Sequence, residues 1–191
     1  MTRTISHLFD DYQNARSAVT ALQQAGFTSN EVSLVASNAD KRYVEDDGAS
    51  GAATGVGVGG AVGAGAGILT ALGVLAIPGL GPLVAAGIFA TTLATTAVGA
   101  AAGGLIGSLM DHGVPEEDAH LYAEGIRRGG TLVTVRASED RAAKADAIFD
   151  QHDPVDMTAR RASYTKSGWS KYDPKAPAYG ADEIKRERSS Y

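Results

Sequence analysis

Apolar and polar positions follow strand and helix periods in two stretches of the chain, which flank a long uncharged stretch. In the first, residues 4–9 are rich in β-branched and aromatic side chains, and an apolar helical stripe follows and stops at Gly26. Asp10 or Asp11 is placed to cap that helix. Residues 32–37 then alternate in polarity, so this stretch predicts a strand, a helix and a second strand.

The same order returns after the uncharged stretch, with one additional helix before its first strand. Pro115 suits the first position of a helix, and the acidic residues 116–118 suit its first turn, where the helix dipole favours anions. A strand over residues 131–136, a helix over 139–150 and a weaker strand over 155–160 complete the pattern. Two such units predict an α+β fold, a ferredoxin-like split βαβ sandwich with its helices on one face of the sheet.

The uncharged stretch between them runs from residue 48 to residue 110 and holds 17 of the 24 glycines. Its glycines form two rows at four-residue spacing, Gly51, Gly55, Gly59, Gly63 and Gly67, then Gly99, Gly103 and Gly107. In a helix, residues four apart lie on one face, so each row makes a groove into which another backbone can pack closely. Prolines and glycines between the rows break any helix. We therefore expect a glycine-zipper helical hairpin, with arms at roughly 50–77 and 83–109 and a tip formed by Ile77, Pro78, Leu80, Pro82 and Leu83.

The apolar side chains of this hairpin are concentrated at its tip. Residues 68–93 contain 12 Leu, Ile, Val and Phe, whereas residues 48–67 contain only three valines. A helix that spans a bilayer is most apolar at its middle, so the pattern favours a tip that is buried while the base packs against protein. Two interpretations stay open. The tip inserts into a lipid bilayer, or the hairpins of a soluble homo-oligomer meet in a shared hub.

Charge divides the rest of the chain. Residues 1–158 hold 9 basic and 18 acidic residues, and residues 159–191 hold 8 basic and 4 acidic residues. The C-terminal part also holds Trp169, Tyr172 and Tyr179, so we expect an extended arm that docks its aromatic rings on an acidic surface, of its own body or of a neighbour. A disordered tail fits the composition equally well. The resulting segments are 1–47 and 111–160 (the two halves of the ferredoxin-like domain), 48–110 (the hairpin) and 161–191 (the arm).

Composition narrows the classes of function. A net charge of −5 disfavours nucleic acid as a partner, and the absence of cysteine excludes disulfides, thiolate metal sites and a cysteine nucleophile. The first residues show no secretory signal pattern, so we expect a cytoplasmic protein, peripheral or hairpin-inserted at the inner membrane.

Three patterns suggest chemistry, and a simpler interpretation accounts for each. Gly55, Gly57 and Gly60 match a dinucleotide-binding spacing, but no apolar strand precedes them and no acidic residue follows at the required distance. The paired acids at 10–11 and 116–118 suit helix capping. The histidines show no metal-ligand spacing: His7, His112, His120 and His152. We expect no enzymatic activity, no metal and no cofactor; a ligand-binding regulatory module stays open as an alternative.

The two flanking halves resemble the bacterial heat-induced general stress protein family, including low-temperature-induced members with a glycine-rich insert. The first half carries the resemblance at Leu8-Phe9-Asp10, Ala18-Val19, Ala25-Gly26-Phe27 and Val32-Ser33-Leu34-Val35. The second half carries it at Gly113 to Ala119, Tyr122, Gly125 and Arg128 to Val133. The resemblance implies a stress-induced bacterial protein with no established activity, and it transfers no catalytic residue. With the glycine rows, it predicts a self-associating stress protein.

Overall fold

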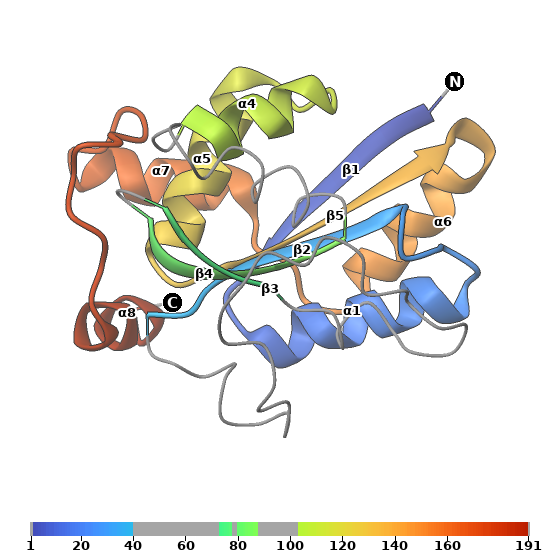
Figure 1. Ribbon diagram of the computed structural model, residues 1–191, viewed down its shortest axis with the longest axis horizontal. Helices are drawn as coiled ribbons and strands as arrows, with labels where there is room; N and C mark the ends of the chain where they lie inside the picture. Colours follow the sequence, from blue (N-terminus) through green and yellow to red (C-terminus); the bar gives the residue numbers. More distant parts are fainter. Residues whose placement is uncertain (1, 40–72, 78–79, 88–102, 191) are drawn as a thin grey trace.

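The computed structural model describes residues 2–39, 73–77, 80–87 and 103–190, and they form an α+β fold around one antiparallel sheet (Figure 1). The sheet order is β1-β5-β2-β4-β3. The strands are β1 (Thr2–Phe9), β2 (Val32–Ser37), β3 (Gly73–Ile77), β4 (Gly81–Ala86) and β5 (Thr131–Ser138). The helices are α1 (Tyr12–Gln24), α4 (Gly103–Asp111), α5 (Glu116–Arg127), α6 (Glu139–Asp150), α7 (Met157–Lys166) and α8 (Ala181–Arg188).

The N-terminal half follows the predicted strand, helix, strand order. Asp11 caps α1, its carboxylate accepting a hydrogen bond from the backbone N–H of Gln13 at 2.6 Å. The connection from β1 to β2 leaves room for one strand between them, and β5 fills it, antiparallel to both. Ile5 and Val32 both pair with Val135, which sets the register of all three strands. The first half is therefore a split βαβ unit.

The predicted strand at residues 155–160 is wrong. The chain leaving α6 passes the edge of β1, where the N–H of Val155 donates to the carbonyl of Leu8 at 2.8 Å, and α7 then begins at Met157. Asp156 explains the change, because its carboxylate accepts hydrogen bonds from the backbone N–H groups of the second and third residues that follow it. That cap favours a helix over a strand at this position.

The predicted helical hairpin is wrong at residues 73–77 and 81–86, which form the β-hairpin of β3 and β4. Short apolar runs suit either a strand or a buried helix, and β2 offers a strand edge with which β4 pairs. Gly81 adopts φ +80° at the turn, a conformation that glycine takes without strain. Residues 103–111 are helical, as predicted for the end of the second arm.

The predicted tip residues are not a tip. Leu80 and Leu83 are buried in the chain's own core, and Ile77 and Pro82 lie within the two strands, while Pro78 lies outside the described residues. Among the glycines of the two rows, only Gly103 and Gly107 are described; Gly51, Gly55, Gly59, Gly63, Gly67 and Gly99 lie outside the described residues. The packing of the first glycine row therefore stays a prediction.

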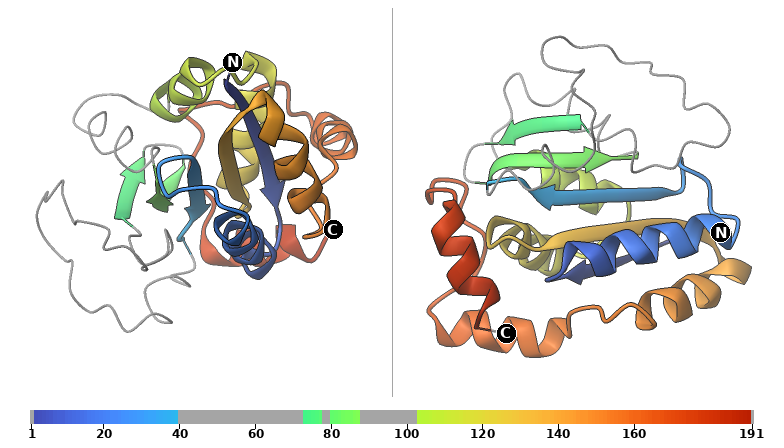
Figure 2. Two further views of the ribbon diagram at one scale, coloured as in Figure 1. Left: turned by 90° about the vertical axis from the view of Figure 1, so that its right-hand side faces the viewer. Right: turned by 90° about the horizontal axis from the view of Figure 1, so that it is seen from below.

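Helices cover both faces of the sheet instead of the single face predicted (Figure 2). One face packs on α1 and α6 through Phe9, Leu34 and Val133 among others, and the opposite face packs on α4 and α5. Every residue of β2 is consequently buried. Helix α5 approaches the sheet very closely at Gly125, where an added Cβ would lie 2.5 Å from Leu8 Cδ2. A larger residue at this position would separate α5 from β1.

The C-terminal segment is folded onto the domain and is not an extended arm. It forms α7, an irregular stretch over residues 167–180, and α8 (Figure 1). Three of its apolar side chains are buried: Tyr164, Tyr172 and Ile184. Tyr172 joins the core cluster beneath α4 and α5. The segment is therefore an integral part of the fold.

Candidate self-association surface and C-terminal clamp

Helix α4 directs Gly107 away from the core. Leu105 and Leu109 are fully buried, whereas an added Cβ at Gly107 would meet no atom within 4 Å. With about 100° between successive residues of a helix, Gly103, Gly107 and Met110 fall within one arc opposite the buried leucines. Met110 is a large hydrophobic side chain that is 43% exposed, and among the described residues no other large hydrophobic side chain is exposed. Helix α4 is thus held in the core by its leucine face, and its opposite face is open at Gly107.

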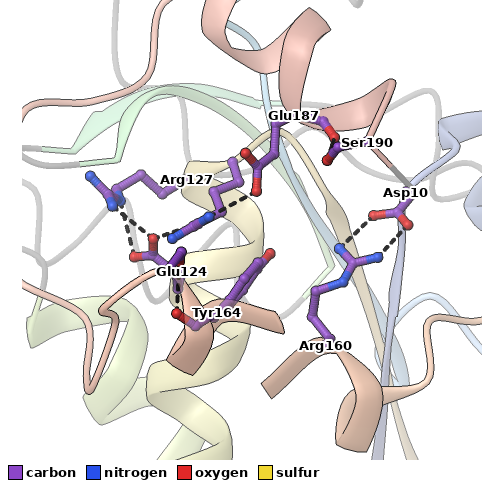
Figure 3. Close-up of polar contacts among 9 residues, drawn as sticks. Asp10, Glu124, Arg127, Arg160, Tyr164, Glu187 and Ser190 are labelled. Carbon is purple, nitrogen blue, oxygen red and sulfur yellow. Dashed lines mark hydrogen bonds and ion pairs between the residues drawn. The ribbon is translucent and has the colours of Figure 1, made fainter. Parts of the chain in front are cut away.

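A buried acidic side chain at the end of α5 organises the docking of the C-terminal segment (Figure 3). Glu124 is 0% exposed and accepts hydrogen bonds from Arg127 Nε at 3.0 Å, Arg127 Nη2 at 2.7 Å and Arg128 Nε at 2.7 Å. Arg128 Nη1 continues to the carboxylate of Glu187 on α8 at 2.8 Å, and Arg127 Nη1 donates to the carbonyl of Pro177 at 3.1 Å. We call Glu124, Arg127, Arg128 and Glu187 the C-terminal clamp.

Aromatic rings enclose the two arginines of the clamp. The guanidinium of Arg127 lies 4.7 Å from the ring centroid of Tyr179, and that of Arg128 lies 4.0 Å from the centroid of Tyr164. Burial by itself would lower the pKa of Arg128, but its hydrogen bonds to Glu187 and Glu124 outweigh burial and raise the pKa. Burial acts on Arg127 in the same direction, and its hydrogen bonds to Glu124 likewise raise its pKa, so both arginines are held charged.

The predicted docking aromatics make three different contacts. Tyr172 is buried in the core, and Tyr179 lies over the arginines of the clamp. Trp169 is half-buried and meets Tyr164 edge to face, with ring centroids 5.9 Å apart. All three pack on the chain's own domain. The acidic group at the centre of the clamp is a single buried glutamate, not an acidic surface.

The sequence offered only an indirect signal for the clamp. The two adjacent arginines before Gly129 suit the C-terminal turn of a helix, where the dipole favours cations. Glu124 is buried in α5 together with the apolar residues Tyr122, Ala123 and Ile126. A carboxylate on an apolar helical stripe is the pattern that indicates a buried ion pair.

A second ion pair borders a pocket of about 500 Å³ at the start of α1 and α7. Arg160 Nη1 and Nη2 donate to the two carboxylate oxygens of Asp10 at 2.8 and 2.5 Å (Figure 3). Two further acids of the lining, Asp11 and Asp156, cap the helices. Of the predicted acid pairs, residues 10–11 thus serve capping and pairing, and residues 116–118 occupy the first turn of α5.

The histidines are dispersed over the fold. His7 lies on β1 beneath α6, 3.8 Å from Asp146, and His120 lies 3.7 Å from Glu116 within α5. Burial lowers the pKa of His7 although Asp146 and Asp150 act in the opposite direction. Within residues 2–39, 73–77, 80–87 and 103–190, no three His, Cys, Asp or Glu side chains are grouped so that they could hold a metal ion.

Comparison with known proteins supplies no relative. The chain matches no protein-family profile, no curated protein and no solved structure. Among the helices of the described part, none combines the length and the apolar character needed to cross a membrane.

Proposed function

We propose that this protein is a non-enzymatic bacterial stress protein that associates with copies of itself through its uncharged glycine-rich segment. The orientation of α4 carries the proposal. The helix uses Leu105 and Leu109 to bind its own core, and its opposite face presents Gly107 and Met110. At Gly107 this face has no side chain, so another backbone can approach closely there, which favours helix pairing.

The proposed partner of this face is another glycine-rich segment. The row that contains Gly107 continues in the sequence to Gly99, and a second row runs from Gly51 to Gly67. The absence of charge from residue 48 to residue 110 removes repulsion between copies. The ferredoxin-like plan remains part of the proposal for the flanking halves, supported by the split unit of β1, α1 and β2 with β5 between the strands.

Gly107→Leu tests the proposal without confusing assembly with folding. The position is helical and has open space around it, so leucine should stabilise the isolated helix by about 0.8 kcal/mol. Ala143→Leu, at an exposed position of α6, is the matched control. In sedimentation velocity without detergent, we expect the wild type and Ala143→Leu to form the same oligomer and Gly107→Leu to be smaller. A wild type that is monomeric at every concentration would refute the proposal.

Membrane association is the part of the proposal that concerns location. Flotation with vesicles, followed by sizing of the fraction that stays in solution, separates the two interpretations of the uncharged segment. A protein at the inner-membrane face should float with the vesicles. If all of it remains in the soluble oligomer, the lipid-free assembly is correct and the membrane location is wrong.

A ligand-binding regulatory role is a second candidate, and the pocket beside Arg160 is the observation that favours it. The lining contains four acidic residues, Asp10, Asp11, Asp153 and Asp156, and one basic residue, Arg160, which pairs with Asp10. Such a lining would select cationic metabolites over anionic ones. A thermal-shift screen with amines and organic acids tests this role, and no shift with any amine would eliminate it.

A further inference from the structure

The two edge strands of the sheet, β1 and β3, differ in how their outward backbone groups are paired. The edge of β1 is covered at two of its outward carbonyls, because Tyr122 Oη donates to the carbonyl of Ser6 at 2.8 Å and the N–H of Val155 donates to the carbonyl of Leu8 at 2.8 Å. The other edge is β3, the last strand in the sheet order. No strand among the described residues pairs with its outer side. An unpaired strand edge is a template for another strand.

The strand register identifies the backbone groups on that edge. The N–H of Asn38, just beyond β2, donates to the carbonyl of Pro82 at 2.8 Å, so the backbone groups of Pro82 and of every second residue after it face β2. The intervening residues of β4 therefore face β3, where they pair with Gly73, Leu75 and Ile77. The N–H and C=O groups of Val74 and Ala76 consequently point away from the sheet.

Residues 73–77 also lack the features that normally prevent edge pairing. Edge strands of soluble proteins commonly carry charged residues or proline. The sequence Gly-Val-Leu-Ala-Ile contains neither, and the nearest charged residues along the chain are Asp47 and Asp111. Nothing in the composition of β3 therefore opposes pairing with another strand.

We infer that β3 pairs with β3 of a second copy and joins the two sheets into one, which specifies an interface within the proposed self-association and rests on it. Val74 and Ala76 lie symmetrically about Leu75. An antiparallel pair with a two-fold axis at Leu75 sets Val74 of each copy opposite Ala76 of the other. Each opposed pair exchanges two backbone hydrogen bonds, so all eight outward groups of the two copies are satisfied. The same segment is complementary to itself, which is the requirement for a closed dimer interface.

Proline substitution tests the pairing because it removes one chosen N–H group. Ala76→Pro removes an outward N–H and spares the bonds between β3 and β4, whereas Leu75→Pro removes an inward N–H and is the control for damage to the β-hairpin itself. For Ala76→Pro we expect the dissociation constant of the dimer, measured by sedimentation equilibrium, to rise at least about tenfold. Its monomer should keep the circular dichroism and melting temperature of the wild type, and Leu75→Pro should lower that melting temperature.

Amide hydrogen exchange supplies a second readout. The amides of Val74 and Ala76 should be protected only at concentrations at which the dimer forms, and the amide of Leu75 should be protected at all concentrations. Protection of Val74 and Ala76 in the monomer would show that the edge is occupied within the chain and would overturn the inference. An unchanged dissociation constant for Ala76→Pro would also overturn it, while a response to Gly107→Leu would leave the proposed self-association standing. A wild type that never associates would remove both.

Discussion

Replacement of Glu124 by glutamine should be among the most destabilising single changes outside the apolar core. The carboxylate is fully buried and accepts three hydrogen bonds, at 3.0, 2.7 and 2.7 Å, from Arg127 and Arg128. Glutamine keeps the size of the side chain but removes the charge and replaces one acceptor with a donor that faces the arginines. Two neighbouring cations then lose the anion between them, although Arg128 retains Glu187.

The expected loss follows from the burial of these groups. Breaking a buried ion pair by removal of one partner costs about 3 to 5 kcal/mol. The arginine side chains are 12% and 11% exposed, so water replaces little of the lost interaction. Because Glu187 still pairs with Arg128, the lower end of the range applies, and we expect the free energy of unfolding to fall by about 3 kcal/mol.

Equilibrium urea denaturation at pH 7 measures this loss, and Glu117→Gln is the matched control. Glu117 lies on the same helix with 89% of its side chain exposed, and its partner Arg161 is 3.9 Å away. The control should change the free energy of unfolding by less than about 0.5 kcal/mol, since exposed ion pairs contribute little. If the two variants are destabilised equally, the clamp does not stabilise the fold and the reasoning fails.

Three further variants test other contacts. Gly129→Ala should lower the free energy of unfolding more than Gly168→Ala. Both glycines have positive φ, but an added Cβ lies 2.4 Å from a methyl group of Ile184 only at Gly129, and equal losses in urea would contradict the contact. Because the pKa of His7 is lowered in the folded protein, His7 binds a proton more readily in the unfolded chain than in the folded one. The free energy of unfolding should therefore fall as the pH drops through about 6.5 toward the lower pKa of the folded state. His7→Gln should reduce the change of the urea midpoint between pH 8 and pH 5, and an unreduced change would contradict the role of His7. Tyr122→Phe should cost about 1 kcal/mol through its lost bond to β1, with faster amide exchange there; unchanged stability and exchange would count against that bond.

Local signals were sufficient for the N-terminal half and for much of the second half. The cap at Asp11, the apolar stripe of α1 and the alternation in β2 each depend on residues close together in the sequence. The same holds for α5 and α6, whose first turns carry the expected acidic residues. Patterns of this kind survive folding because tertiary contacts reinforce them.

The two errors in secondary structure have different causes, a distant strand in one case and a local helix cap in the other. Residues 73–77 and 81–86 are apolar enough for a buried helix. They form strands because β4 pairs with the edge of β2 and β3 pairs with β4. Residues 155–160 have a plausible strand pattern, and the cap at Asp156 started a helix instead. The strands at residues 73–77 and 81–86 cannot be read from the local pattern, because a short apolar run is compatible with both structures, whereas the cap at Asp156 is a local signal.

The sequence by itself determined the α+β class, the first split unit and the separation of an uncharged glycine-rich segment from charged flanks. Those properties follow from periodicity and composition, which do not depend on where the segments meet. Only the tertiary structure decided that the uncharged segment adds two strands to the sheet, that α4 turns Gly107 outward and that Glu124 binds the C-terminal segment through two arginines. Each of these depends on contacts between residues far apart in the chain. Burial then decides the result, because hydrogen bonds and charges removed from water must find partners within the fold.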